Sequence, residues 1–335
     1  MKLYEIADPN GIDSLKLVDR PTPKPSPGEV LMRVRATSLN YRDLAIIRGG
    51  LRGMMKTPLV PISDGAGDVV ETGPGVTRLK KGDRVAAIFT QGWLAGGPFK
   101  GMYSSSLGGG IDGMLAEYVV LREDGFVHIP EYLSYEEAAT LPCAAVTSWN
   151  ALVVEGRVKP GDTVLIMGTG GVSIFALQFA KMHGARVIAT SSSDAKLHRL
   201  KEMGASELIN YKTTPDWDEK VLELTGGDGV DHVVEIGGAG TLPKSINAVK
   251  AGGIVHLIGI LAGAAKVDPM PLLFKQARVQ GILVGSHEMF VAMNRAMEVN
   301  RVHPVIDKVF PFTEAQAAYR HLESGSHFGK VCIAI

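Results

Sequence analysis

The stretch from Thr163 to Ser193 constrains the fold of this chain most, because it predicts a strand, a tight turn, a helix and a second strand in direct succession. Residues 163–167 form an apolar run rich in β-branched side chains, which is typical of a buried parallel strand. The glycine-rich turn 168–173 follows at once, and apolar residues then recur at helical spacing until a second strand at 185–190. This order is typical of a nucleotide-binding unit.

The turn itself carries the predicted binding chemistry. Its glycines allow backbone N–H groups to approach a pyrophosphate closely, and the following helix N-terminus adds a favourable dipole. Ser173 stands where the usual pattern has its last glycine, so the motif depends on its flanking strand and helix for support. An ordinary glycine-rich turn is the alternative. The residues predicted to bind a dinucleotide here are Gly168, Thr169, Gly170, Gly171 and Val172.

The end of the second strand predicts the type of dinucleotide. NAD-binding units usually place Asp or Glu there to bind the ribose hydroxyls, whereas this chain has Ser191. A carboxylate would repel a 2′-phosphate and a hydroxyl accommodates one, with Lys196 or Arg199 supplying balancing charge. We therefore expect a preference for NADP(H), with NAD(H) also possible, bound through Ser191, Ser192 and Lys196. The alternative is that the serines only cap the next helix, through Ser193 or its neighbour.

Composition excludes several function classes. The 335 residues, 45% of them hydrophobic, are enough for two globular domains. Lys plus Arg and Asp plus Glu both total 35, so no basic surplus favours nucleic acid. No apolar run has the length of a membrane span, residues 1–10 lack a signal-peptide pattern, and two cysteines form no disulfide framework. We expect a cytoplasmic protein that acts on a small molecule and binds neither nucleic acid nor membranes.

The chain changes character along its length. Residues up to about 127 are β-rich, with strands predicted at 29–37, 68–71, 83–88 and 116–121, and an irregular loop at 89–113 holds seven glycines between Gly92 and Gly110. Later strands alternate with helices, which predicts an α/β fold with a doubly wound, six-stranded parallel sheet. Those six strands are expected at 163–167, 186–190, 207–210, 231–236, 253–258 and 279–284.

Helices are predicted in the middle and at the end of the chain. Ser134 and Glu137 form a capping-box pattern that opens a helix, Pro142 interrupts it, and a second helix is expected at 144–154. Helices at 289–299 and 313–322 and a last strand at 330–335 do not continue the alternation. The predicted domains are therefore 1–127 with 289–335, and 128–288.

Six short motifs together resemble the medium-chain dehydrogenase/reductase superfamily, which contains zinc alcohol dehydrogenases and zinc-free quinone oxidoreductases. The resemblance covers essentially the whole chain. It implies a GroES-like β-barrel catalytic domain, built from both chain ends, and an inserted Rossmann domain. The motifs are Leu-Asn-Tyr-Arg-Asp at 39–43, Asp-Gly-Ala-Gly at 64–67, Gly-Pro-Gly-Val at 73–76, Lys-Gly-Asp-Arg-Val at 81–85, the turn at 168 and Phe-Gly-Lys-Val at 328–331.

Departures from the zinc-dependent branch are as informative as the matches. The resemblance places Asn40 and Ser63 where that branch has its first two zinc ligands, and only Cys143 matches a ligand position. Catalytic zinc requires three protein ligands and a water. The four cysteines of a structural zinc lobe are also missing from residues 91–111. We predict no metal, the alternative being a weakly held ion between Asp64 and Cys143.

The resemblance also implies roles for individual residues. Asn40 and Tyr41 are the predicted catalytic residues, with Tyr41 donating a hydrogen bond to a developing oxyanion and Asn40 positioning substrate or nicotinamide. An aromatic side chain that merely closes the barrel is the alternative for Tyr41. Phe89, Trp93 and Cys143 are expected to line the substrate pocket, although an inert buried thiol is the alternative for Cys143. Further cofactor contacts are expected at Thr147, Tyr211, Gly237, Gly259, Gly285 and Lys330.

These observations favour a zinc-independent, NADP(H)-preferring oxidoreductase that transfers hydride between nicotinamide and a quinone, activated alkene or carbonyl. The alternatives are an NAD(H)-dependent alcohol dehydrogenase and a non-catalytic dinucleotide-binding structural or sensor protein. We also expect a homodimer, because residues 279–284 would leave a long apolar sheet edge exposed in a monomer.

Overall fold

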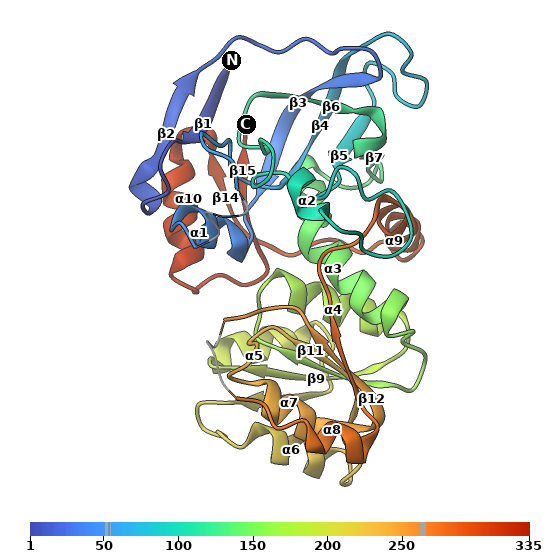
Figure 1. Cartoon of the computed structure of the whole chain (residues 1–335). Coiled ribbons are helices and arrows are strands. Elements are labelled where there is room, and N and C mark those ends of the chain that lie inside the picture. Colours follow the sequence, from blue (N-terminus) through green and yellow to red (C-terminus); the bar gives the residue numbers. More distant parts are fainter. Residues whose placement is uncertain (51–52, 54, 262–265) are drawn as a thin grey trace. The chain divides into compact units, whose positions relative to one another are not determined.

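The computed structural model describes residues 1–50, 53, 55–261 and 266–335, which form two compact units (Figure 1). The first unit comprises Met1–Val146 and Val284–Ile335, and the second comprises Thr147–Leu283. The sequence placed the limits at 127/128 and 288/289. Residues 128–146 lie with the first unit because its helix α2 (Tyr135–Ala139) packs on strands β3, β4 and β15 of that unit.

The first unit is built around a seven-stranded sheet in the order β14-β15-β3-β4-β5-β7, with β6 also paired to β3. A separate antiparallel pair, β1 and β2, precedes it. Its strands are β1 (Lys2–Ile6), β2 (Leu15–Asp19), β3 (Glu29–Ser38), β4 (Asp64–Thr72), β5 (Arg84–Ala87), β6 (Tyr118–Arg122), β7 (Phe126–His128), β14 (Ile306–Pro311) and β15 (Lys330–Ala334), and its other helices are α1 (Tyr41–Ile47), α9 (His287–Asn300) and α10 (Ala315–Glu323).

Strand β3 is the centre of this sheet. Its alternating pattern buries Val30, Met32 and Val34 in one apolar core. The strand pairs antiparallel with β4, β6 and β15, and Cys332 lies opposite Ser38. Segments from the two ends of the chain therefore share one sheet.

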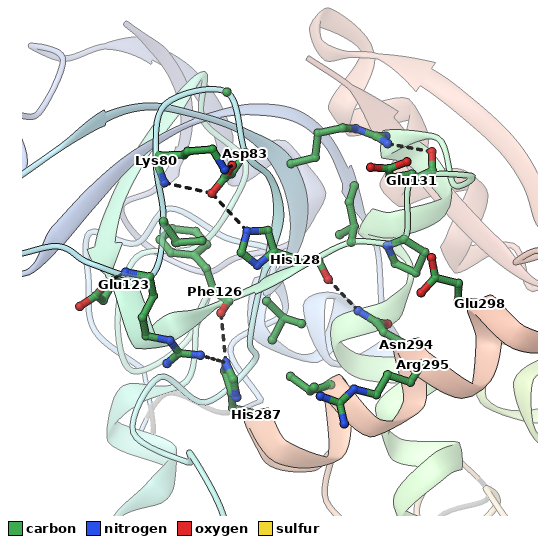
Figure 2. Close-up of a pocket in the computed structure, with 18 residues that line it drawn as sticks. Lys80, Asp83, Glu123, Phe126, His128, Glu131, His287, Asn294, Arg295 and Glu298 are labelled. Atoms are coloured by element: carbon green, nitrogen blue, oxygen red, sulfur yellow. Dashed lines mark hydrogen bonds and ion pairs between the residues drawn. The ribbon is translucent and has the colours of Figure 1, made fainter.

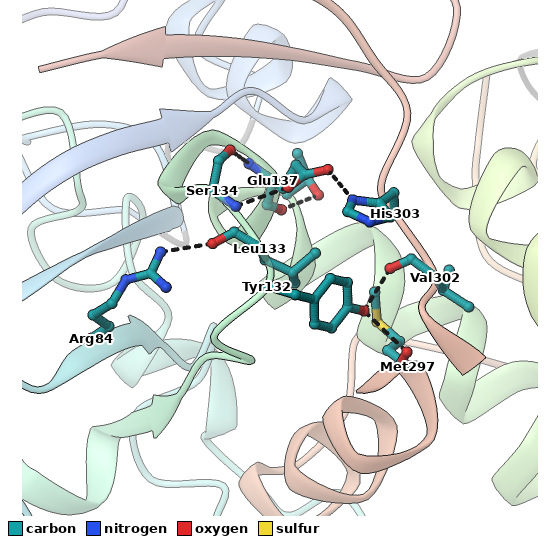
Figure 3. A network of polar contacts seen from close by, with 9 residues as sticks. Arg84, Tyr132, Leu133, Ser134, Glu137, Met297, Val302 and His303 are labelled. Carbon is teal, nitrogen blue, oxygen red and sulfur yellow. Dashed lines mark hydrogen bonds and ion pairs between the residues drawn. The ribbon is translucent and has the colours of Figure 1, made fainter. Parts of the chain in front are cut away.

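A polar network joins α2 and the residues just before it to the last turn of α9 and the segment that follows (Figure 3). The Tyr132 hydroxyl lies 3.0 Å from the Met297 carbonyl oxygen and 2.7 Å from that of Val302. His303 Nδ1 lies 2.7 Å from Glu137 Oε1. Glu137 also completes the predicted capping box with the residue at the start of α2, which confirms that local prediction.

The second unit contains a six-stranded sheet in the order β10-β9-β8-β11-β12-β13, and every pair in it is parallel. This confirms the predicted doubly wound sheet. Its strands are β8 (Thr163–Met167), β9 (Arg186–Ser191), β10 (Glu207–Asn210), β11 (Val230–Glu235), β12 (Val249–Leu257) and β13 (Arg278–Gly281), and its helices are α4 (Gly171–Met182), α5 (Asp194–Glu202), α6 (Trp217–Leu224), α7 (Leu242–Ala248) and α8 (Met270–Lys275).

Strands β4 and β12 begin four residues earlier than predicted, and the last strand of the parallel sheet and the helix expected to break at Pro142 also differ from the structure. Strand β13 ends at Gly281, three residues earlier than expected, and the apolar side chains of Ile282 and Val284 that follow are buried. Pro142 does not interrupt the helical path: a π-helical turn, Leu141–Ala145, leads through α3 (Val146–Trp149) into a second π-helical turn, Asn150–Glu155. The proline lies at the start of the first turn, where its missing N–H is not needed. Among the described helices, none combines the length and apolar character that a membrane crossing requires.

A buried pair of histidines lies in the second unit. His232 Nε2 is 3.2 Å from Asp162 Oδ2, and His232 Nδ1 is 3.3 Å from His256 Nε2. If His232 donates to the carboxylate, it can accept from His256, and both rings are then neutral. Burial, with His232 and Arg278 nearby, lowers the pKa of His256 to about 3.

This depressed pKa predicts that acid destabilises the second unit. A neutral buried histidine contributes stability above the pKa of its unfolded form, 6.5, and that stability is lost as the pH falls toward the folded-state value of about 3. We expect the contribution of His256 to the free energy of unfolding to be about 1.4 kcal/mol smaller near pH 5.5 than near pH 8. Urea titrations at both pH values should show a weaker pH dependence for His256→Gln than for the parent. The exposed His198→Gln is the control, and equal pH dependence in the parent and His256→Gln would contradict the prediction.

Candidate functional site

The turn after β8 presents open backbone at the start of α4. Gly168 has a φ of 73°, a conformation that side chains other than glycine rarely adopt. Gly170 occupies the N-cap position of α4 and has ordinary extended backbone. A Cβ added at Gly170 would meet no atom within 4 Å, so the space above the helix N-terminus is open. The geometry suits a bound pyrophosphate.

Ser173 shows why the missing last glycine does not disturb this turn. Its side chain is fully buried, and its Oγ donates a 2.6 Å hydrogen bond to the Met167 carbonyl oxygen at the end of β8. That contact keeps α4 close to the strand, which is the packing role of the third glycine in the usual motif.

The predicted phosphate site lies at the end of β9. Ser191 is buried, and its Oγ accepts a 3.3 Å hydrogen bond from Ser193 N. Ser193 in turn caps α5 by accepting from Lys196 N. Ser193 is therefore the N-cap of α5, as the alternative expected. Ser191 is not the cap and lies at the end of β9. Tyr211 lies beside Ser191, because its backbone N donates to the Ser191 carbonyl oxygen. The Tyr211 residue is 41% exposed.

Three predicted cofactor glycines also have packing roles. A Cβ at Gly237 would lie 2.2 Å from Thr241 Oγ1, and one at Gly259 would lie 1.9 Å from the Ile236 carbonyl oxygen. Gly285 belongs to the first unit, where a Cβ would collide with neighbouring side chains. These close approaches account for glycine at each position, and the cofactor contacts remain predictions.

Glu235 is a buried residue of the second unit that the sequence analysis did not single out. Its Oε1 accepts hydrogen bonds of 2.6 Å from Gly237 N and 3.0 Å from Gly238 N, and it also accepts from Thr241 Oγ1. The Ser245 hydroxyl donates to its other oxygen. Glu235 thus shapes the loop after β11. A carboxylate at the end of a strand was the only sequence signal.

The main polar cluster of the first unit follows from strand pairing. Asn40 comes two residues after the end of β3, Asp64 begins β4, and Lys330 begins β15. Because β4 and β15 both run antiparallel to β3, these three residues meet at the same end of the sheet. All three are at least nine-tenths buried.

Lys330 makes the shortest contacts in this cluster. Its Nζ donates hydrogen bonds of 2.6 Å to the Leu39 carbonyl oxygen and 2.6 Å to Asn40 Oδ1. These bonds fix the amide of Asn40, since only its oxygen can accept from an ammonium. The Asn40 Nδ2 is buried, and the Asn40 side chain acts on the Asp64 carboxylate, whose pKa it lowers.

Asp64 connects Asn40 and Lys330 to Cys143. Its Oδ1 accepts a 2.7 Å hydrogen bond from Ser63 Oγ, and its Oδ2 accepts a 3.2 Å bond from Cys143 N. Burial raises the pKa of Asp64, while Lys330 and then the Asn40 side chain act most strongly to lower it. Burial and the adjacent Asp64 raise the pKa of the Cys143 thiol, although that side chain is only half-buried by surface area. Cys143 is therefore held as a neutral thiol.

Asp43 closes the first turn of α1. Its Oδ2 accepts a 2.7 Å hydrogen bond from Asn40 N, which links the start of the helix to the cluster. Burial raises the pKa of Asp43 to about 6, and Arg42 is the strongest opposing charge. The Arg42 guanidinium donates to the Leu107 carbonyl oxygen and lies 4.5 Å from the centre of the Phe89 ring. Arg42 therefore joins α1 to the glycine-rich loop.

The remaining predicted residues lie in different settings. Tyr41 is 49% exposed, whereas Trp93 is buried and its Nε1 donates to the Gly96 carbonyl oxygen. Thr147 is buried at the start of the second unit. Within the first unit, the structure brings together Asn40, Lys330 and Cys143 through Asp64. Among the described residues, no hydrogen bond or ion pair joins the side chains of Tyr41 or Trp93 to this cluster. Roles for Tyr41 and Trp93 remain predictions.

A cavity of about 740 Å³ in the first unit lies outside this polar cluster (Figure 2). His128 Nε2 and Lys80 Nζ lie 3.2 and 2.9 Å from the Asp83 carboxylate. The His287 side chain contacts the Phe126 carbonyl oxygen, and Asn294 Nδ2 donates to that of His128. The cavity is not lined by the residues of the polar cluster, Asn40, Asp64, Cys143 and Lys330. We place the candidate chemistry in the cluster because the predicted site residues meet there.

Comparisons with known proteins agree with this two-part architecture. Residues 26–131 match the alcohol dehydrogenase GroES-like domain, and residues 171–298 match the zinc-binding dehydrogenase family. A zinc-type alcohol dehydrogenase-like protein of Schizosaccharomyces pombe is 46% identical over 97% of this chain and 96% of its own length. The chain belongs to the medium-chain dehydrogenase/reductase superfamily. The first unit is thus the GroES-like part and the second the Rossmann-like part, as the resemblance implied.

Two further relatives extend the comparison. A Sinorhizobium meliloti 1021 protein assigned as an alcohol dehydrogenase has a crystal structure with a TM-score of 0.93 and 43% identity, covering 100% of this chain and 98% of that one. The quinone oxidoreductase of Sus scrofa is 29% identical over 90% of this chain and 87% of its own length. This medium-chain dehydrogenase/reductase is therefore an oxidoreductase of a family that binds nicotinamide dinucleotides.

Proposed function

We propose that this enzyme is a zinc-independent, NADP(H)-preferring reductase of quinones, activated alkenes or carbonyls. The observation that carries the proposal is the buried Lys330 ammonium among the residues that occupy the zinc-ligand positions. Its Nζ is 2.6 Å from Asn40 Oδ1, and Lys330 lowers the pKa values of both Asp64 and Cys143. The positive charge of this cluster is thus supplied by a side chain.

The residues of the cluster do not fit catalytic zinc. Zinc binds thiolate, imidazole or carboxylate ligands, whereas the ligand positions here hold the Asn40 amide and the Ser63 hydroxyl. The Lys330 ammonium lies among these residues, 2.6 Å from Asn40 Oδ1, and would repel a second cation. Among the described residues, no three His, Cys, Asp or Glu side chains are grouped to hold a metal ion.

The second unit fits a dinucleotide. The open turn at Gly168 and Gly170 would hold the pyrophosphate, and the dinucleotide supplies the hydride when bound. The Ser191 hydroxyl at the end of β9, in place of a carboxylate, supports a preference for the 2′-phosphate form. In the first unit, Asn40 would position the acceptor or the nicotinamide, and the half-exposed Tyr41 hydroxyl would donate to the oxygen on which negative charge develops.

A second candidate function is an NAD(H)-dependent alcohol dehydrogenase. It is favoured by the similarity to the S. pombe relative, a zinc-type alcohol dehydrogenase-like protein. A preference for NADH over NADPH, together with alcohol oxidation, would support this second function.

The outer edge of the Rossmann-like sheet supports a homodimer. Strand β13 is an edge strand, and the helix before it, α8, exposes Leu273 at 68% and Phe274 at 78%. Ile260 is also 78% exposed. Apolar side chains beside an unpaired strand edge favour association with a second copy.

Metal independence is tested by NADPH oxidation with a simple quinone before and after exhaustive chelation. We expect equal turnover in both samples, because Lys330 supplies the charge of the cluster. A zinc-dependent alcohol dehydrogenase treated in parallel should lose its activity. Loss of turnover on chelation in this enzyme, with recovery on adding zinc, would contradict the proposal.

Cofactor preference is tested by Ser191→Asp. The new carboxylate would repel the 2′-phosphate, so we expect the ratio of the Kd for NADPH to the Kd for NADH to rise about ten-fold. This change corresponds to roughly 1.4 kcal/mol of binding free energy. Fluorescence titration with each dinucleotide gives both values. Ser206→Asp, before β10 at the opposite end of this parallel sheet, should change neither ratio nor affinity. Equal effects of Ser191→Asp on both dinucleotides would rule out this phosphate site.

The dimer is tested by sedimentation velocity. We expect the parent to have about twice the chain mass of 35.7 kDa and Phe274→Glu to shift toward monomer, because the new charge would lie in the interface. Val299→Glu, at an 83% exposed position on α9, is the control for an added surface charge. A parent that stays monomeric at every concentration would exclude the dimer.

A further inference from the structure

We infer that Glu235 is a positioning residue for the dinucleotide, because it fixes the loop after β11 on which the nicotinamide half would lie. This inference rests on the dinucleotide binding that is part of the proposed function. It gives a binding role to a buried side chain that no sequence motif marks. The loop comprises residues 236–241 and is called the β11 loop below.

Four donors converge on the Glu235 carboxyl group. Its Oε1 accepts hydrogen bonds of 2.6 Å from Gly237 N, 3.0 Å from Gly238 N and 2.7 Å from Thr241 Oγ1. The Ser245 hydroxyl donates to its other oxygen. Glu235 and both glycines are buried, so without this acceptor two backbone N–H groups would lack a partner away from water. The carboxyl group therefore determines the path of the β11 loop.

The β11 loop lies at the edge of the sheet where a dinucleotide would bind. Every strand pair in this sheet is parallel, so the ends of β9, β8, β11 and β12 meet at one edge in that order. Sheets of this kind bind ligands where the strand order reverses, which here is between β8 and β11. With the pyrophosphate at the turn after β8 and the adenosine ribose at Ser191, the nicotinamide half would extend over the ends of β11 and β12.

Close contacts join the β11 loop to the turns on either side of it. A Cβ added at Gly168 would lie 3.5 Å from Ile236 Cδ1, so the Ile236 side chain packs beside the turn after β8. On the other side, Gly238 has a φ of 85°, and a Cβ there would lie 2.8 Å from the Gly259 carbonyl oxygen. The loop therefore lies between the predicted pyrophosphate turn and the residues that follow β12.

Glu235 is itself connected to both neighbouring strands. Its carbonyl oxygen accepts hydrogen bonds of 2.8 Å from Ile258 N and 3.2 Å from Gly259 N, just beyond β12. The Ser245 Oγ that donates to its carboxyl group also lies 3.8 Å from Met167 Sδ at the end of β8. The backbone of Glu235 is thus held at the strand end, while its side chain holds the loop.

The test compares the binding of a whole dinucleotide with that of its adenosine half. Glu235→Met removes the acceptor and keeps the length of the side chain. Isothermal titration calorimetry gives the Kd for NADPH and for adenosine 2′,5′-bisphosphate, which lacks the nicotinamide half. We expect the Kd for NADPH to rise about ten-fold, the equivalent of one or two lost hydrogen bonds.

The adenosine half should be little affected by Glu235→Met. The turn after β8 has its own support, because Gly168 N donates a 2.8 Å hydrogen bond to the Thr190 carbonyl oxygen of β9. We therefore expect the Kd for adenosine 2′,5′-bisphosphate to change less than about three-fold.

Two milder variants follow the same hydrogen bonds. Glu235→Gln keeps an oxygen that can accept from the two glycine N–H groups, so it should recover most of the affinity for NADPH. Thr241→Val removes one donor to Oε1 at nearly constant volume and should raise the Kd for NADPH about three-fold. If Glu235→Met does not fold, an unchanged Kd for NADPH in Thr241→Val overturns the inference.

Asp162→Leu is the matched control in the second unit. Asp162 is also buried and accepts a backbone hydrogen bond, from Lys159 N at 3.0 Å. It lies just before β8, at the opposite end of the parallel sheet. The substitution should lower the Tm, as Glu235→Met does, and leave both Kd values unchanged. A loss of stability alone is thus separated from a positioning role.

The remaining outcomes are distinct. An unchanged Kd for NADPH in folded Glu235→Met, or an equal rise for both ligands, would overturn the inference and leave the reductase function intact. A parent that prefers NADH would contradict only the expected preference, and a ten-fold rise for NADH without a rise for ADP would still support the role of Glu235. A parent that binds neither dinucleotide would overturn the proposed function itself.

Discussion

The antiparallel pairing of β15 with β3 is the interaction on which the rest of the first unit depends. It places Cys332 opposite Ser38, so the residue that begins β15 lies beside the residues that follow β3. Without that register, Lys330 and Asn40, 290 positions apart in the chain, would not meet. The same pairing joins the end of the chain to the sheet formed by its beginning.

Charge compensation explains why the cluster can be buried. Two buried carboxyl groups, Asp43 and Asp64, would be costly without a nearby cation. The Lys330 ammonium acts on both carboxyl groups, and Arg42 is the strongest opposing charge at Asp43. The cluster therefore carries compensating positive charge on its own side chains.

Local patterns predicted the second unit well. Strands β8 and β10 begin and end where the sequence placed them, because each is a short run bounded by clear turn residues. Strand β13 was predicted too long. Ile282 and Val284 are apolar and buried but lie beyond the end of the strand, and an apolar run in the sequence does not distinguish the two cases. Pro142 was expected to break a helix, but a π-helical turn accommodates it.

The candidate site was only partly predictable. Asn40, Cys143 and Lys330 could be named from family motifs, yet their connection through Asp64 could not, because no local pattern specifies contacts across nearly the whole chain. The roles expected for Tyr41 and Trp93 rest on motif position alone. Glu235 was missed because its hydrogen bonds to the following loop depend on backbone geometry that a sequence pattern does not contain.

The late position of β15 has a consequence for biosynthesis. Strands β3 and β4 leave the ribosome early, but the strand that completes their sheet follows only after the entire second unit has been made. During that interval the edge of β3 has no β15 to pair with, and Asp64 lacks Lys330, its strongest opposing charge. The nascent chain therefore acquires this cluster in one late event, and a chain that stops before residue 330 cannot assemble it.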